Sequence, residues 1–146
     1  MDLQFDLKAD PVDAAHPVEP LAVEPDTPLG DVLALMKLQK TGSLLVCRDA
    51  VLVGIFTERD ALRWMADGGE LDVPIERLMT RNPATLLAGA KVAEAVKIMS
   101  QGGYRRLPVM DGAKPVGMLS MRDFVRFIVS LFPRASLNLP PNHSHP

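Results

Sequence analysis

Two stretches of the sequence share one pattern: GIFTERD at residues 54–60 and GMLSMRD at residues 117–123. Each reads glycine, two apolar residues, a hydroxyl residue, any residue, arginine and aspartate. The second stretch begins 63 residues after the first, and this offset holds without a gap over a longer region. Further identical pairs at the offset are Pro20 and Pro83, Met36 and Met99, Val53 and Val116, and Arg63 and Arg126. The chain is therefore two copies of one unit.

Each copy predicts the order β-α-β-β-α. A short extended piece, at residues 21–23 or 84–87, precedes a helix with apolar residues at the i, i+3, i+4, i+7 spacing. We expect Thr27 and Pro28 to start the first of these helices, and Gly42, or Gly102 and Gly103, to end the pair. Strands follow at 43–47 and 51–56, and at 107–110 and 116–119; the last helices are expected at 58–66 and 121–131.

This alternation indicates an α/β (α+β type) fold in which two repeats of about 50 residues pack together, because one alone would bury too little apolar surface. We expect repeats at residues 18–68 and 79–132, joined by a linker at 69–78. Residues 1–17 and 133–146 have the proline-rich, polar composition of flexible segments.

The composition excludes several classes of protein. The 146 residues carry a formal net charge of −2, which argues against a protein built to bind nucleic acid. The single cysteine, Cys47, lies in an apolar run and is expected to be a buried, inert thiol in a reducing compartment. The sequence starts without a signal peptide and holds no apolar run of about 18 residues, so we expect a cytoplasmic protein without a membrane span.

The residues offer no catalytic constellation. The histidines are His16, His143 and His145, all outside the repeats, and no metal-ligand spacing or phosphate-binding glycine loop is present. The pair at His143 and His145 would give a metal only two ligands on a tail. We expect neither an enzyme nor a metal protein.

The repeated pattern supports two interpretations. Thr57 with Asp60, and Ser120 with Asp123, have the spacing of a capping box at the start of a helix. The same helix end is also suited to a ligand, because aspartate can accept hydrogen bonds from a ribose diol and the free amides attract phosphate. The residues alone leave both open.

The second copy has a basic pair, Arg105 and Arg106, at the start of a strand. Guanidinium groups pair well with phosphate oxygens, although a solvated basic edge would have the same sequence. Side chains alternate along a strand, so we expect one of the two to point inward. The first copy has Gly42 and Ser43 at these positions and lacks the cations.

Three features together resemble a tandem pair of CBS domains, also called a Bateman module, over residues 18–131. They are the repeated pattern, the run RRLPVMD at residues 105–111, and the junction VPIERLMTRNP at residues 73–83. The resemblance implies two repeats packed about a pseudo-two-fold axis with facing sheets. It also implies clefts for AMP, ADP, ATP or S-adenosylmethionine, with no required cofactor.

Carried over by position, the resemblance implies one cleft lined by Asp123 and Ser120 with Arg105 or Arg106, and another lined by Asp60 and Thr57. Because the first copy lacks the cations, we expect the Asp123 cleft to be the better site. The other residues expected at the ligand are Thr85, near the base or ribose, Pro108 in the basic run, and Arg122.

The final helix of each repeat is relevant to whether the protein forms an oligomer. The run at residues 124–132 is apolar nearly all round, and residues 61–66 are its counterpart. Such helices need a partner surface, and the resemblance implies a homodimer that forms a disc of four repeats. A stand-alone pair would be a sensor acting on a separate protein; the alternative is a ligand-free scaffold or dimerisation module.

Overall fold

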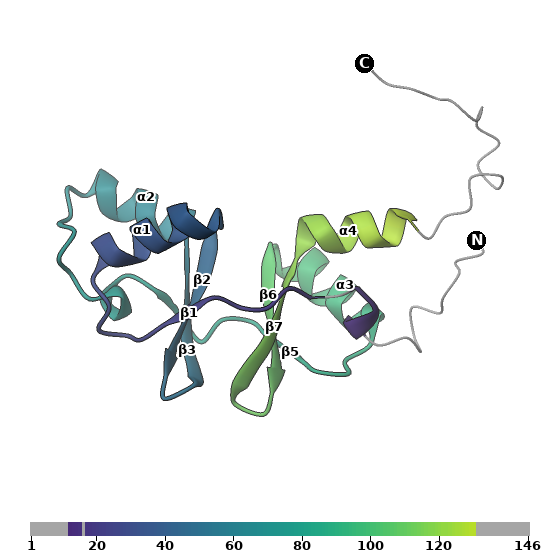
Figure 1. The fold of residues 1–146 in the computed structure, drawn as a ribbon. Helices are drawn as coiled ribbons and strands as arrows, with labels where there is room; N and C mark the ends of the chain where they lie inside the picture. Colours follow the sequence, from purple (N-terminus) through teal and green to yellow (C-terminus); the bar gives the residue numbers. More distant parts are fainter. Residues whose placement is uncertain (1–11, 16, 131–146) are drawn as a thin grey trace, which may run out of the picture.

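The structure is a computed structural model that describes residues 12–15 and 17–130. It has two lobes with facing sheets, and the helices lie away from the interface between the sheets (Figure 1). The first lobe comprises β1 (Ala22–Val23), α1 (Leu29–Gln39), β2 (Ser43–Arg48), β3 (Val51–Thr57) and α2 (Glu58–Ala66). The second comprises β5 (Leu86–Leu87), α3 (Val92–Gly102), β6 (Arg106–Asp111), β7 (Lys114–Ser120) and α4 (Met121–Ser130). The predicted β-α-β-β-α order is confirmed in both repeats.

The two sheets share one pairing pattern. In the first sheet β1 is parallel to β2, and β2 and β3 form an antiparallel hairpin. The second sheet repeats this arrangement with β5, β6 and β7. Both hairpins also carry a register shift at the same place, between Val46 and Cys47 and between Val109 and Met110. The duplication therefore extends to a local irregularity of the strands.

Each sheet is extended by the segment that leads into the other repeat. Strand β4 (Thr80–Arg81), which precedes the second repeat, pairs with Gly54 and Ile55 of the first sheet. Conversely, Val18 forms an antiparallel bridge with Met118 of the second sheet. The purple N-terminal segment in Figure 1 accordingly runs from the second lobe to the first. The backbone thus ties the two repeats together through both of these leading segments.

Two short 3₁₀ helices also precede one repeat and pack against the other. η1 (Val12–Ala15) contributes Val12, fully buried in the core of the second lobe, and η2 (Ile75–Arg77) contributes Ile75 to the first. Their amides donate to equivalent carbonyls, Val12 to Ala90 at 2.6 Å and Ile75 to Thr27 at 2.8 Å. Residues 1–17 were expected to be a flexible segment; Val12–Ala15 instead form a 3₁₀ helix whose first residue is buried and hydrogen-bonded to Ala90. Residues 1–11, 16 and 131–146 lie outside the described residues.

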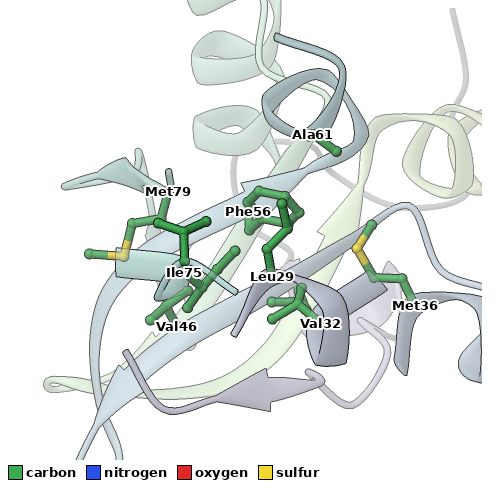
Figure 2. Close-up of a cluster of buried hydrophobic side chains, with 10 residues drawn as sticks. Leu29, Val32, Met36, Val46, Phe56, Ala61, Ile75 and Met79 are labelled. Atoms are coloured by element: carbon green, nitrogen blue, oxygen red, sulfur yellow. The ribbon is translucent and has the colours of Figure 1, made fainter. Parts of the chain in front are cut away.

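Each lobe has its own core. In the first, apolar side chains from α1, the sheet and the linker meet around Phe56, which is fully buried (Figure 2). The second core is built from the corresponding elements and includes Leu107, Val109 and Phe124. A smaller cluster, Leu45, Cys47, Ile55 and Met118, draws side chains from both sheets. Burial between the sheets therefore fixes which strand faces look toward the other lobe.

The start and end of α1 differ from the prediction. The N-cap residue is Pro28, not Thr27, and no side chain caps the helix. Linker carbonyls take that role, because the Leu29 amide donates to Val73 at 2.9 Å and the Gly30 amide to Leu71 at 2.9 Å. The helix ends at Gln39, and its C-cap residue in the left-handed region is Lys40 rather than Gly42. Distant backbone thus replaces the expected local cap.

Candidate functional site

A pocket of about 520 Å³ is lined by residues of both repeats, within the range of small-molecule sites. The start of α2, the linker around β4 and the segment leading into β6 form its walls. The lining residues are Ile55, Thr57, Glu58, Arg59, Asp60, Arg63, Thr80, Pro83, Ala84, Gly103, Tyr104, Arg105 and Arg106.

Asp60 is the buried acid of this pocket, with 8% of its surface exposed. Its Oδ2 accepts from the Thr57 amide at 3.0 Å and the Thr57 hydroxyl at 3.1 Å, while the Asp60 amide donates to Thr57 Oγ1 at 3.4 Å. Its Oδ1 accepts from the Thr80 hydroxyl at 3.3 Å and lies 3.9 Å from Arg63 Nη1. The capping-box interpretation is thus confirmed in the first repeat, where the same carboxylate also holds β4 against α2.

The second copy of the pattern has a looser geometry. The Asp123 amide donates to Ser120 Oγ at 3.1 Å, but Asp123 is exposed. One cause lies in the neighbouring segment. The residue that corresponds to Thr80 at the 63-residue offset is Pro17, which has no hydroxyl to donate to the aspartate. The two copies of the pattern are therefore chemically unequal.

The basic pair lies in the pocket of Asp60. Leu107 and Val109 of β6 point into the second core, so Arg106 points to the opposite face, toward the other lobe. Its Nη2 atom lies 3.0 Å from the place that a Cβ on Gly42 would occupy. The sequence grouped Arg105 and Arg106 with Asp123, whereas the pocket that both arginines line contains Asp60. One of the two was expected to point inward; both line the pocket, and Arg105 precedes the strand, so the alternation along β6 does not set its direction.

The charge of the pocket suits an anion. Four arginines and two acids line it, which leaves two excess positive charges. Among the described residues, the ion pairs within 4.0 Å are Arg48 with Glu76 and Arg63 with Asp60. Arg105 and Arg106 thus have no carboxylate partner at that distance in the described chain. Guanidinium groups so placed can bind phosphate or carboxylate oxygens.

Five of the predicted site residues do not line this pocket: Thr85, Pro108, Ser120, Arg122 and Asp123. Thr85 is exposed just before β5, Pro108 is buried within β6, and Arg122 is exposed on α4. Lining residues that the sequence reasoning missed include Glu58, Thr80, Pro83, Ala84 and Tyr104. All five lie within or beside the quoted motifs, and the facing of the two lobes was needed to bring them together.

Cys47 fits the inert interpretation. It is buried in the cluster drawn from both sheets, and burial, with a smaller effect of the Glu24 charge, raises the pKa of its thiol. In the part of the chain that the structure describes, no three His, Cys, Asp or Glu side chains gather as a metal site. No helix in the same part has both the length and the apolar character to cross a bilayer. His143 and His145 lie outside the described residues.

The duplicated α/β unit, the facing sheets and the cationic pocket between the lobes define a two-lobed module with a small-molecule pocket. The family comparison agrees with this class, since the CBS domain matches residues 14–67 and again residues 75–130. The chain belongs to the CBS domain family, as a tandem pair.

Known proteins resemble the chain in sequence and fold. An uncharacterized 17.7 kDa protein of Acidianus ambivalens is 32% identical over 75% of this chain and 67% of its own length. The match to arabinose 5-phosphate isomerase GutQ of Salmonella typhi is 33% identical but spans only 30% of that enzyme. Two solved structures cover 88% of this chain. An uncharacterized conserved protein from Pyrococcus horikoshii has a TM-score of 0.74, 28% identity and 97% of its chain covered. The CBS domain protein PAE2072 from Pyrobaculum aerophilum, complexed with AMP, has a TM-score of 0.72 and 25% identity, and 95% of its chain is covered.

Proposed function

We propose that the chain is a regulatory sensor that binds an adenosine-containing anion, with AMP the first candidate, in the pocket between Asp60 and the basic pair. The observation that carries the proposal is that an acid of the first repeat and two arginines of the second line one cavity. The AMP complex of the similar protein PAE2072 supports this ligand class. ADP, ATP and S-adenosylmethionine belong to the same class, and the excess positive charge favours ligands that carry phosphate.

The contacts suggest how such a ligand would lie. Arg105 and Arg106 would hold the phosphate, and Asp60 would accept from the ribose. A carboxylate has about four acceptor positions, and Thr57 and Thr80 occupy three of those of Asp60. A ribose diol would therefore compete with the Thr80 hydroxyl for Oδ1. Ligand binding would thereby loosen the bond between β4 and α2, which couples the site to the linker.

The two clefts are proposed to be unequal, in the reverse order of the sequence-based expectation. At the 63-residue offset, Arg105 and Arg106 correspond to Gly42 and Ser43. If the arginines of the second repeat serve Asp60, pseudo-symmetry leaves Asp123 facing two residues without charge. We therefore propose one strong anion site per chain, at Asp60.

The response of the sensor would pass to a separate protein. A ligand that touches both lobes shifts their relative arrangement only if it binds one arrangement more tightly. Exposed apolar side chains on α2 and α4, among them Leu62 at 68% and Val125 at 52%, support the proposal of a homodimer through these helices. Phe124 is buried in the core, so one face of α4 is already covered. We propose a cytoplasmic protein without catalysis of its own.

Isothermal titration of AMP into the wild type tests the site. Replacing Arg106 with alanine should weaken binding by about 10-fold or more, the loss of one charge-assisted hydrogen bond. Arg122→Ala is the matched control, because Arg122 is an exposed arginine that does not line the pocket. It should leave the affinity unchanged, as should Asp123→Ala.

The same titration decides between the two functions. If the wild type unfolds cooperatively but binds none of the four adenosine compounds, the sensor proposal fails and the ligand-free scaffold is favoured. If AMP binds and Asp123→Ala abolishes binding while Arg106→Ala does not, the ligand sits in the other cleft. Asp60→Asn is less suitable as the main test, because Asp60 also caps α2.

A further inference from the structure

One acid of the pocket lies beside the arginine that would hold the phosphate. Glu58 is the first residue of α2, and its amide donates to the Gly42 carbonyl at 3.1 Å. Its carboxylate fills the space over Gly42, where an added Cβ would clash with it and would lie 3.0 Å from Arg106 Nη2. Gly42 is not among the glycines in the left-handed region. Its missing side chain therefore matters for space, which Glu58 and Arg106 share from opposite lobes.

The Glu58 carboxylate is not committed to another partner. Within the described chain it makes no hydrogen bond and no ion pair within 4.0 Å, whereas Asp60 is held by Thr57 and Thr80. Glu58 is also exposed to the pocket. A free carboxylate beside Arg106 competes with an incoming phosphate for the guanidinium and repels further negative charge.

The position on the helix strengthens this effect. The amino end of α2 carries partial positive charge that would favour an anion, and Glu58 places a negative charge in its first turn. With Glu58 present, the lining holds two excess positive charges, which match a nucleoside monophosphate dianion. Longer phosphate chains bring additional negative charge toward the same carboxylate.

We propose that Glu58 selects the ligand by charge, favouring a nucleoside monophosphate over the di- and triphosphate. The proposal rests on the proposed function of this pocket. Glu58 acts as a specificity residue that sets how many phosphates the basic pair accepts.

The test titrates AMP, ADP and ATP as sodium salts into the wild type and Glu58→Gln, at low ionic strength with EDTA so that no divalent cation masks the phosphates. Glu58→Gln keeps the shape and removes the charge. The ratio of ATP affinity to AMP affinity should rise about two- to fivefold, the size expected for one exposed charge, with ADP between. Added salt should shrink the difference between the two proteins.

Glu94→Gln is the matched control, because Glu94 lies in the first turn of α3 but does not line the pocket. It should leave the ratio at the wild-type value. Thermal unfolding checks that each variant is folded. If Glu58→Gln does not fold, Glu58→Ala serves as the second variant that removes the charge.

The outcomes separate the two proposals. If the wild type binds AMP and removal of the Glu58 charge leaves the ATP-to-AMP ratio unchanged, or raises all three affinities equally, the selectivity proposal is wrong and the proposed function stands. If the wild type binds no nucleotide, the proposed function fails and the role of Glu58 fails with it.

Discussion

Replacing Val12 with alanine tests whether the N-terminal segment belongs to the core of the second repeat. Val12 is fully buried there, and its amide is bonded to Ala90. The change removes two methyl groups at about 0.8 kcal/mol each, and the cavity left behind adds to this. We expect the free energy of unfolding to fall by roughly 2 kcal/mol, or roughly 4–8 °C in Tm for a chain of this size.

Urea unfolding followed by far-UV circular dichroism and by Trp64 fluorescence measures the loss. Val18→Ala is the matched control, because it makes the same change in the same N-terminal region at a side chain that is 57% exposed. It should stay within about 0.5 kcal/mol of the wild type. Trp64 lies on α2 of the first lobe, so a shift seen by both signals would mean that the lobes unfold together.

One result would refute the reasoning. If Val12→Ala and Val18→Ala are equally mild, both within about 0.5 kcal/mol of the wild type, then η1 does not pack in the second core. The exchange of leading segments between the repeats would then be limited to β4 and the linker.

The remaining predictions concern the cap, a close backbone approach and the thiol. Thr57→Ala should lower the free energy of unfolding by about 0.5–2 kcal/mol, and Ser120→Ala by less because its cap is half-formed; equal losses in urea melts would contradict the difference. Gly54→Ala should cost roughly 1–3 kcal/mol, since its Cβ would lie 2.5 Å from the Met79 sulfur; an unchanged melting curve would mean that β4 is not docked there. Burial raises the pKa of the Cys47 thiol, so the folded state holds this proton more tightly than the unfolded state. The contribution of the thiol to the free energy of unfolding is therefore complete below the unfolded pKa of about 8.5 and is lost as the pH rises above that value. In Cys47→Ala the free energy of unfolding should fall less steeply with rising pH. If the variant shows the same fall as the wild type, the thiol is not the cause of the pH dependence.

Some of the site was within reach of the sequence and some was not. The Thr57–Asp60 pattern and the basic pair, which the sequence singled out, line one pocket in the structure; each could be recognised because it is defined by spacing over a few residues. Their partnership was not readable from the sequence: Arg106 lies opposite Ser120 in the ladder, and its guanidinium also approaches Gly42 of the first lobe. Directly paired residues share one face of a sheet, so Ser120 lies beside the start of the Arg106 side chain, whose guanidinium reaches on toward Gly42 of the first lobe.

The sequence by itself determined the duplication, the order of elements in each repeat and the bounds of α2, which were predicted at residues 58–66 and found at Glu58–Ala66. Periodicity, turn residues and capping act over a few positions, so they can be recognised along the chain. Only the tertiary structure decided that linker carbonyls cap α1, that leading segments exchange between lobes, and that Asp60, Arg105 and Arg106 line one pocket. These contacts join distant positions whose approach depends on how the two sheets pack, and no local pattern encodes that packing.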